Sequence, residues 1–100
     1  MLIGVPKEIK NHEYRIGLTP GGVRELVKRG HNVMIERDGG AGIGLTNEQY
    51  QQAGAEIVSQ ASEIFNRADM IIKVKEPQAV ECKMLKPGQL LFTYLHLAPD

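Results

Sequence analysis

Cysteine, net charge and long apolar runs are all scarce in this sequence, and each scarcity excludes a class of protein. Cys82 is the only cysteine, which excludes an internal disulfide and a cysteine-rich zinc site. Twelve basic side chains balance twelve acidic ones, so no net field would recruit nucleic acid or an anionic membrane. We therefore expect no nucleic-acid partner, no membrane partner and no metal site.

The longest apolar runs are too short to cross or enter a membrane. No segment approaches the roughly 18 apolar residues of a spanning helix, and the N-terminus MLIGVPKEIK lacks the apolar core of a signal peptide. Hydrophobic residues make up 42% of the 100 residues and charged residues 24%, a composition typical of soluble globular domains. We expect one domain in the cytoplasm.

Strand and helix signals alternate along nearly the whole chain. Helix starts are marked by Thr19-Pro20 and by a capping box from Thr46 to Gln49. The alternation predicts an α/β fold with an open parallel sheet and helices on both faces, Rossmann-like or flavodoxin-like in class. The expected strands are residues 2–5, 31–36, 56–58, 69–74 and 90–94, and the expected helices are residues 20–29, 47–53, 62–67 and 80–85.

The final predicted strand, residues 90–94, carries the most apolar run of the chain, LLFTY. We expect it to be buried in the sheet. In a chain of alternating strands and helices it should lead to a further helix, yet the sequence ends at Asp100 inside the next loop. We therefore interpret residues 1–100 as an N-terminal domain that is incomplete at its C-terminal end and truncated from a longer protein.

A glycine-rich segment, Gly39 to Gly44, lies between a predicted strand and a predicted helix, where phosphate loops occur. Leu45 occupies the position of the P-loop lysine, and the dinucleotide pattern G-x-G-x-x-G lacks its third glycine. We interpret the glycines as a flexible connection with positive-φ turns. The chain is then predicted to contain no cofactor-binding residue of its own.

Charged side chains follow several predicted strands, where open parallel sheets bind their ligands. Arginine offers a planar fork for a carboxylate, lysine a point charge for a carbonyl oxygen, and histidine a proton carrier near neutral pH. Together these groups suit a small 2-oxo or 2-amino acid. Each also has a simpler interpretation, since Arg15 could pair with Glu13 or Glu8, and the strand-end lysine could be a solvated charge. The residues are Glu8 after the first strand, Arg15 in the loop beyond it, Lys75 after the fourth strand and His96 after the fifth.

Four stretches of the sequence resemble one known family in colinear order. They are IGVPKEIKNHEYRIGLTPGGV, AGAEIV, IIKVKEP and LLFTYLHLAP, and they are similar to the N-terminal region of the alanine dehydrogenase family. A sister family, the nucleotide-binding subunit of proton-translocating transhydrogenase, shares the opening but generally lacks the lysine and histidine found here as Lys75 and His96. Their presence favours the dehydrogenase.

The resemblance implies a function and a set of roles. Arg15 is expected to hold the substrate carboxylate, Lys75 to contact the carboxylate or the carbonyl oxygen of pyruvate, and His96 to act as the catalytic acid and base. Glu8 and Tyr94 are expected to support these residues. The implied reaction is the reversible oxidative deamination of L-alanine to pyruvate and ammonium by a cytoplasmic, hexameric oxidoreductase. NAD would be bound mainly by a Rossmann domain that is absent from this chain, so these residues alone should not turn over.

Two other functions remain open at this point. The chain could belong to a transhydrogenase-like subunit, which would have a membrane-spanning continuation or partner. It could instead be a free-standing module that binds a small oxo acid without catalysis, as its length permits.

Overall fold

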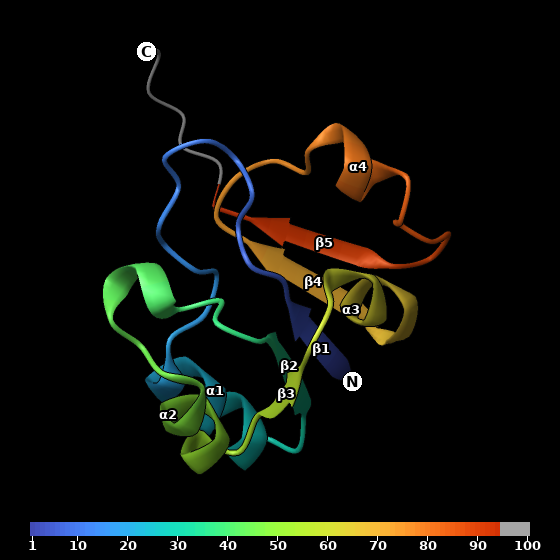
Figure 1. Cartoon of the computed structure of the whole chain (residues 1–100). Coiled ribbons are helices and arrows are strands. Elements are labelled where there is room, and N and C mark those ends of the chain that lie inside the picture. The colour runs from blue at the N-terminus through green and yellow to red at the C-terminus, as the bar shows by residue number, and fades with distance from the viewer. Residues whose placement is uncertain (95–100) are drawn as a thin grey trace.

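The computed structural model describes residues 1–94 and contains a five-stranded parallel sheet (Figure 1). The spatial order of the strands is β3-β2-β1-β4-β5, and all four neighbouring pairs are parallel. The open parallel sheet expected from the alternating pattern is confirmed. The strands are β1 Leu2–Val5, β2 Asn32–Glu36, β3 Glu56–Val58, β4 Met70–Lys73 and β5 Leu90–Thr93.

Helices connect the strands, and their ends follow the local capping signals. The Thr19 hydroxyl accepts a hydrogen bond from the Gly22 backbone N–H at the start of the first helix. Thr46 and Gln49 form the reciprocal capping box of the second, which ends at Gly54 with φ +110°. The helices are α1 Pro20–Lys28, α2 Asn47–Ala53, α3 Ala61–Arg67 and α4 Ala79–Cys82, with a short 3₁₀ turn η1 at Ala41–Ile43.

Two apolar clusters pack against opposite faces of the sheet. One face is covered by α1 and α2, where Val23 and Tyr50 lie on the β1 and β2 side chains Val5 and Ile35. The other face is covered by α3, whose Ile64 and Phe65 are completely buried. Burial on both faces explains why Val33, Met34 and Ile35 are all inaccessible along β2. The prediction of helices on both faces is therefore confirmed.

The side on which the chain adds new strands to the sheet changes after β3, so that β1 and β4 become neighbours. The chain runs outward from β1 through β2 to β3, then crosses back through α3 to place β4 on the other side of β1. Such a switch point leaves a crevice beyond the carboxyl ends of the two strands, because the loops that leave them diverge to opposite faces. In this fold the segments that follow Val5 and Lys73 meet there.

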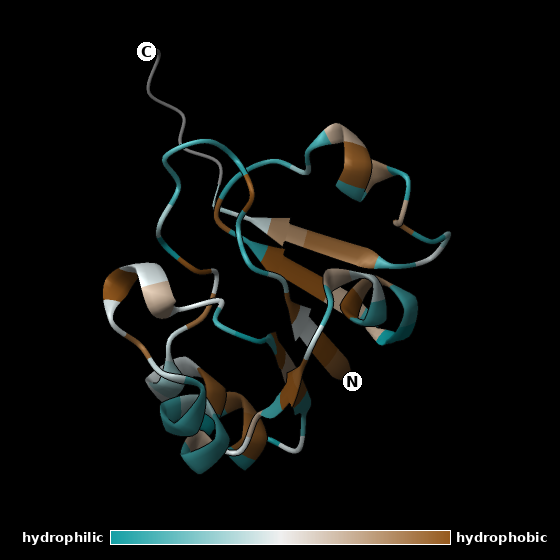
Figure 2. Cartoon of the chain, in the orientation of Figure 1, coloured by the Kyte–Doolittle hydropathy of each residue, from teal (hydrophilic) through white to brown (hydrophobic). Residues whose placement is uncertain are grey.

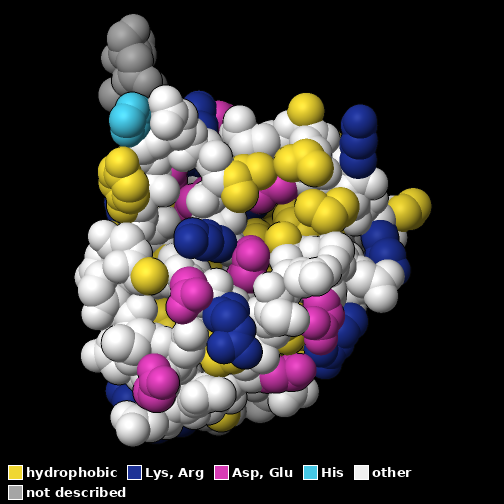
Figure 3. Space-filling model, in the orientation of Figure 1, with side chains coloured by type: hydrophobic (Ala, Val, Ile, Leu, Met, Phe, Trp, Pro, Cys, Tyr) yellow, Lys and Arg dark blue, Asp and Glu magenta, His cyan; other side chains and the backbone are white. Residues whose placement is uncertain are grey.

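The expected burial of the last strand is wrong. Leu90, Leu91 and Phe92 are 50%, 41% and 51% exposed, although they are as apolar as the central strands (Figure 2). The physical reason is position: β5 is an edge strand paired only with β4 among residues 1–94. Figure 3 shows apolar side chains gathered on the face of the molecule around β5 and α4.

Charges of both signs are mixed over the face shown in Figure 3. No single-sign field forms there, as the equal numbers of basic and acidic residues suggest. Among residues 1–94, no helix combines the length and the apolar character needed to cross a membrane.

Candidate functional site

A hollow lies beside the loop that joins β1 to α1. Its volume is about 370 Å³, and it is lined by residues 7–15 together with Gly39 and Gly42. The loop begins at Pro6, which cannot continue the strand ladder, and it stays irregular until Thr19 caps the next helix. The carboxyl edge of the sheet thus carries a long polar loop next to the switch point.

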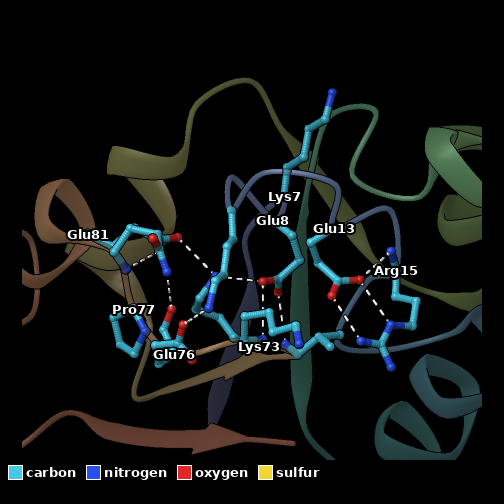
Figure 4. Close-up of polar contacts among 12 residues, drawn as sticks. Lys7, Glu8, Glu13, Arg15, Lys73, Glu76, Pro77 and Glu81 are labelled. Carbon is cyan, nitrogen blue, oxygen red and sulfur yellow. Dashed lines mark hydrogen bonds and ion pairs between the residues drawn. The ribbon is translucent and has the colours of Figure 1, made fainter. Parts of the chain in front are cut away.

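Arg15 in this loop is held by Glu13 in a two-pronged contact (Figure 4). Arg15 Nε donates to Glu13 Oε2 at 3.0 Å, and Nη2 donates to Oε1 at 2.9 Å. The Glu13 side chain is 5% exposed, whereas that of Arg15 is 63% exposed. The simpler interpretation, in which Arg15 pairs with Glu13, is therefore confirmed.

That pair does not use the whole guanidinium. Glu13 takes the edge formed by Nε and Nη2, and no acceptor among residues 1–94 bonds Nη1. A guanidinium has five N–H donors, so its end edge can still bind a second carboxylate. Glu13 thus orients the exposed guanidinium of Arg15 and also neutralises its charge.

The charges of the loop perturb one another. Hydrogen bonds from Arg15 hold the pKa of Glu13 below its ordinary value, and the charge of Lys75 adds to this effect. The same contact with Glu13 raises the pKa of Arg15, with a smaller contribution from the charge of Glu8. The charge of Lys75 therefore acts on Glu13, and the charge of Glu8 acts on Arg15.

Glu8 joins the loop after β1 to the end of β4. Its Oε2 accepts a hydrogen bond from the Val74 backbone N–H at 2.9 Å, and its Oε1 accepts one from the Lys75 N–H at 3.3 Å. Lys73 Nζ donates to the same Oε1 at 2.9 Å. Figure 4 shows Glu8 and Glu13 leaving the same loop, Glu8 toward Lys73 and Glu13 toward Arg15.

Sequence reasoning missed Lys73 and Glu81, which complete a buried ionic cluster with Glu8. Lys73 Nζ lies 3.1 Å from Glu81 Oε2, and all three side chains are at most 2% exposed. The missed signal was in the strand itself, because a lysine inside the apolar run MIIKV must find a carboxylate when the strand is buried. Glu81, on the one-turn helix α4, carries no comparable signal in the sequence.

The end of β2 adds a further carboxylate to this edge of the sheet. The Lys7 backbone N–H donates to the Glu36 carboxylate at 2.7 Å. Burial raises the pKa of Glu36, and the hydrogen bond from Lys7 partly opposes that rise. The loop after β1 is therefore fastened to both neighbouring strands, through Glu36 on β2 and through Glu8 on β4.

The remaining predicted site residues lie at the ends of β4 and β5. Lys75 is partly buried two residues beyond β4. The Tyr94 hydroxyl donates to the Gly17 carbonyl at 2.8 Å, which ties the end of β5 to the same loop that carries Arg15. His96 lies outside the described residues.

The interpretation of the glycine segment needs correction. Only Gly44 within it has a positive φ, +80°. The others are needed for close packing, because a Cβ at Gly39 would lie 2.9 Å from the Glu36 carbonyl oxygen and one at Gly42 would lie 3.1 Å from Tyr14. The segment is therefore a packed part of the wall of the hollow, in which Gly39 and Gly42 are lining residues.

This arrangement suits the binding of a small anion. It combines the oriented guanidinium of Arg15 with Lys7 and Lys10, which line the same hollow, and Glu8 holds the adjoining backbone of Val74 in place. Within residues 1–94, no group of three or more His, Cys, Asp and Glu side chains is placed to hold a metal ion.

Known proteins share both the sequence and the fold of this chain. Alanine dehydrogenases from Methanococcus maripaludis and Bacillus subtilis are 58% and 51% identical to it over 100 residues. The chain spans only 27% and 26% of the lengths of these relatives. A solved structure of L-alanine dehydrogenase, 52% identical, superimposes with a TM-score of 0.91 over 97% of this chain and 27% of its own.

A second solved structure, a transhydrogenase from Sinorhizobium meliloti, superimposes almost as well. Its TM-score is 0.88 over 95% of this chain and 27% of its own, but its sequence identity is only 26%. A family model described as the alanine dehydrogenase/PNT N-terminal domain matches residues 4–100. The chain therefore belongs to the alanine dehydrogenase/PNT N-terminal domain family.

Proposed function

We propose that residues 1–100 belong to the substrate-side domain of an NAD-dependent L-alanine dehydrogenase. The reaction is the reversible oxidative deamination of L-alanine to pyruvate and ammonium. The observation that carries the proposal is the Arg15 guanidinium, which Glu13 orients in the loop that lines the hollow. The sequence identity to the solved dehydrogenase structure is 52%, twice the 26% identity to the transhydrogenase structure, and this supports the same choice.

The residues take the following roles in this proposal. Arg15 binds the substrate carboxylate through the end edge that Glu13 leaves, and Lys75 contacts the carboxylate or the carbonyl oxygen of pyruvate. His96 carries the proton at the substituent of the reacting carbon. Glu8 and Tyr94 hold the backbone around these groups, since Glu8 binds the Lys75 N–H and Tyr94 binds the Gly17 carbonyl.

NAD would accept the hydride of L-alanine. The glycine segment does not match a phosphate loop, because it carries Leu45 where that loop has lysine. We propose that a Rossmann domain outside this chain binds the cofactor. The whole protein is proposed to be a cytoplasmic homohexamer without a nucleic-acid or membrane partner.

A transhydrogenase-like function is the second candidate, favoured by the fold match of TM-score 0.88. The two functions differ in their substrates. A dehydrogenase needs an oxo acid and ammonium, whereas a transhydrogenase exchanges hydride between two nicotinamide nucleotides.

The test is NADH oxidation by the uninterrupted reading frame that contains this chain. We expect oxidation only when pyruvate and ammonium are both present. Hydride exchange between NADPH and an NAD analogue, without pyruvate, would instead support the transhydrogenase. Pyruvate binding without any turnover would point to a non-catalytic oxo-acid module.

A further inference from the structure

The buried cluster of Glu8, Lys73 and Glu81 is the least explained feature of the molecule. One ammonium lies between two carboxylates, at 2.9 Å from Glu8 Oε1 and 3.1 Å from Glu81 Oε2. Taking three charged groups out of water opposes folding unless each finds good partners. Glu8 has three donors, whereas Glu81 Oε2 faces Lys73 without an aligned hydrogen bond.

Stability alone does not account for such a cluster. Buried ion pairs and triads are often matched or exceeded in stability by apolar side chains of similar size. An apolar residue at position 73 would also continue the run MII of β4 into the core. What an apolar residue at position 8 could not do is accept hydrogen bonds from the Val74 and Lys75 backbone N–H groups.

The cluster lies beside two of the segments that carry proposed substrate-binding residues. Glu8 belongs to the same loop as Arg15, and its carboxylate holds the backbone of Val74 and Lys75. Lys73 prevents that carboxylate from turning away, and Glu81 fixes the ammonium from its other side. Glu81 is itself anchored, since its Oε1 accepts a hydrogen bond from the Gln78 N–H at 2.8 Å.

We propose that Lys73 and Glu81 are positioning residues that act through Glu8, and that this clamp sets the distance between Lys75 and the Arg15 loop. The inference rests on the proposed function, since it concerns the same oxo-acid site. The clamp links three segments that are far apart in sequence, namely the exits of β1 and β4 and the helix α4. Without it, the loop that carries Arg15 and the segment that carries Lys75 would still be joined by the exposed Lys10–Glu76 ion pair, which fixes their separation less firmly.

The test uses Glu8→Gln in the full reading frame, because glutamine keeps the size of the side chain and leaves Lys73 and Glu81 as a neutral pair. One amide end would then face N–H donors and lose those hydrogen bonds. We expect faster hydrogen exchange at the Val74 and Lys75 amides and a pyruvate KM raised about tenfold. The NADH KM should stay unchanged.

The control is Glu63→Gln, which removes an exposed pair with Arg67 on α3. It should change neither the amide exchange nor the pyruvate KM.

A purely structural role would give a different pattern. It would lower kcat through loss of folded enzyme and leave the pyruvate KM unchanged. If Glu8→Gln does not fold, Glu81→Gln serves instead, because it keeps the backbone bonds of Glu8 and removes only one carboxylate from Lys73. We expect the same changes in it, of smaller size.

The exchange measurement separates failure of the clamp from failure of the proposed function. Unchanged exchange at Val74 and Lys75 in the folded variants overturns the clamp, whatever the wild-type enzyme does with pyruvate. Faster exchange with an unchanged pyruvate KM overturns the positioning role for substrate binding. A wild-type enzyme that neither binds nor reduces pyruvate overturns the proposed function. Faster hydrogen exchange in the variants would then still support a clamp on the Lys75 backbone.

Discussion

Replacing Arg15 with alanine is expected to raise the pyruvate KM of the full-length enzyme by about 10- to 150-fold. A hydrogen-bonded contact with a charged partner contributes about 1.5–3 kcal/mol, and each 1.4 kcal/mol corresponds to about tenfold in affinity. The guanidinium already has its side edge fixed by Glu13, so little freedom is lost when the substrate binds. Steady-state kinetics with pyruvate as the varied substrate measures the effect.

Arg15→Lys is the matched variant for this prediction. It keeps the charge but loses the planar fork, so it should lie between wild type and Arg15→Ala. The NADH KM should stay constant in both variants. A pyruvate KM that does not change in Arg15→Ala would remove Arg15 from the substrate site and leave its pair with Glu13 as a surface contact.

The second large effect is expected from His96→Ala. Proton transfer by a positioned side chain contributes typically about 10²–10⁴-fold to the rate, and we expect kcat to fall within that range. His31→Ala is the control, because His31 precedes β2 at the opposite end of the sheet from the proposed site. Rapid-mixing measurement of NADH oxidation under saturating pyruvate and ammonium would show the loss. Wild-type kcat in His96→Ala would leave the proton carrier to another residue.

The arrangement of elements could be predicted because its signals are local. A threonine with proline after it starts α1, the capping box from Thr46 starts α2, and Gly54 ends α2 in a left-handed conformation. The alternation of these elements with apolar runs is sufficient to predict a parallel sheet. None of these signals depends on residues distant in the sequence.

The main errors concern packing, although the last helix is also shorter than expected, Ala79–Cys82 instead of residues 80–85. The apolar run of β5 gave no indication that only β4 would pair with it among residues 1–94. The glycines after β2 looked like turn residues, but most are required because Tyr14 and Glu36 approach them closely. For β5 and for Gly42 the deciding neighbour is distant in the sequence, whereas Glu36 lies close to Gly39 along the chain.

The candidate site was predictable in part for the same reason. Residues that follow strands must meet at one edge of a parallel sheet, and Glu8 after β1 indeed accepts a hydrogen bond from the Lys75 N–H after β4. That Arg15 and Lys75 share a substrate site stays a prediction. The partners inside the fold were not predictable in this way. Glu81 contacts Lys73 only because α4 packs over the end of β4. No local sequence pattern predicts that packing.

The most direct test of the account is whether pyruvate covers Lys75. Full-length protein would be treated with an amine-acylating reagent, with and without pyruvate and NADH, and labelling at each lysine read by mass spectrometry. Lys28, exposed at the far end of α1, is the internal control. We predict that pyruvate slows acylation of Lys75 several-fold, leaves Lys28 unchanged, and gives no protection in Arg15→Ala. Equal labelling of Lys75 at a pyruvate concentration that saturates turnover would contradict the account, because the substrate would then bind elsewhere.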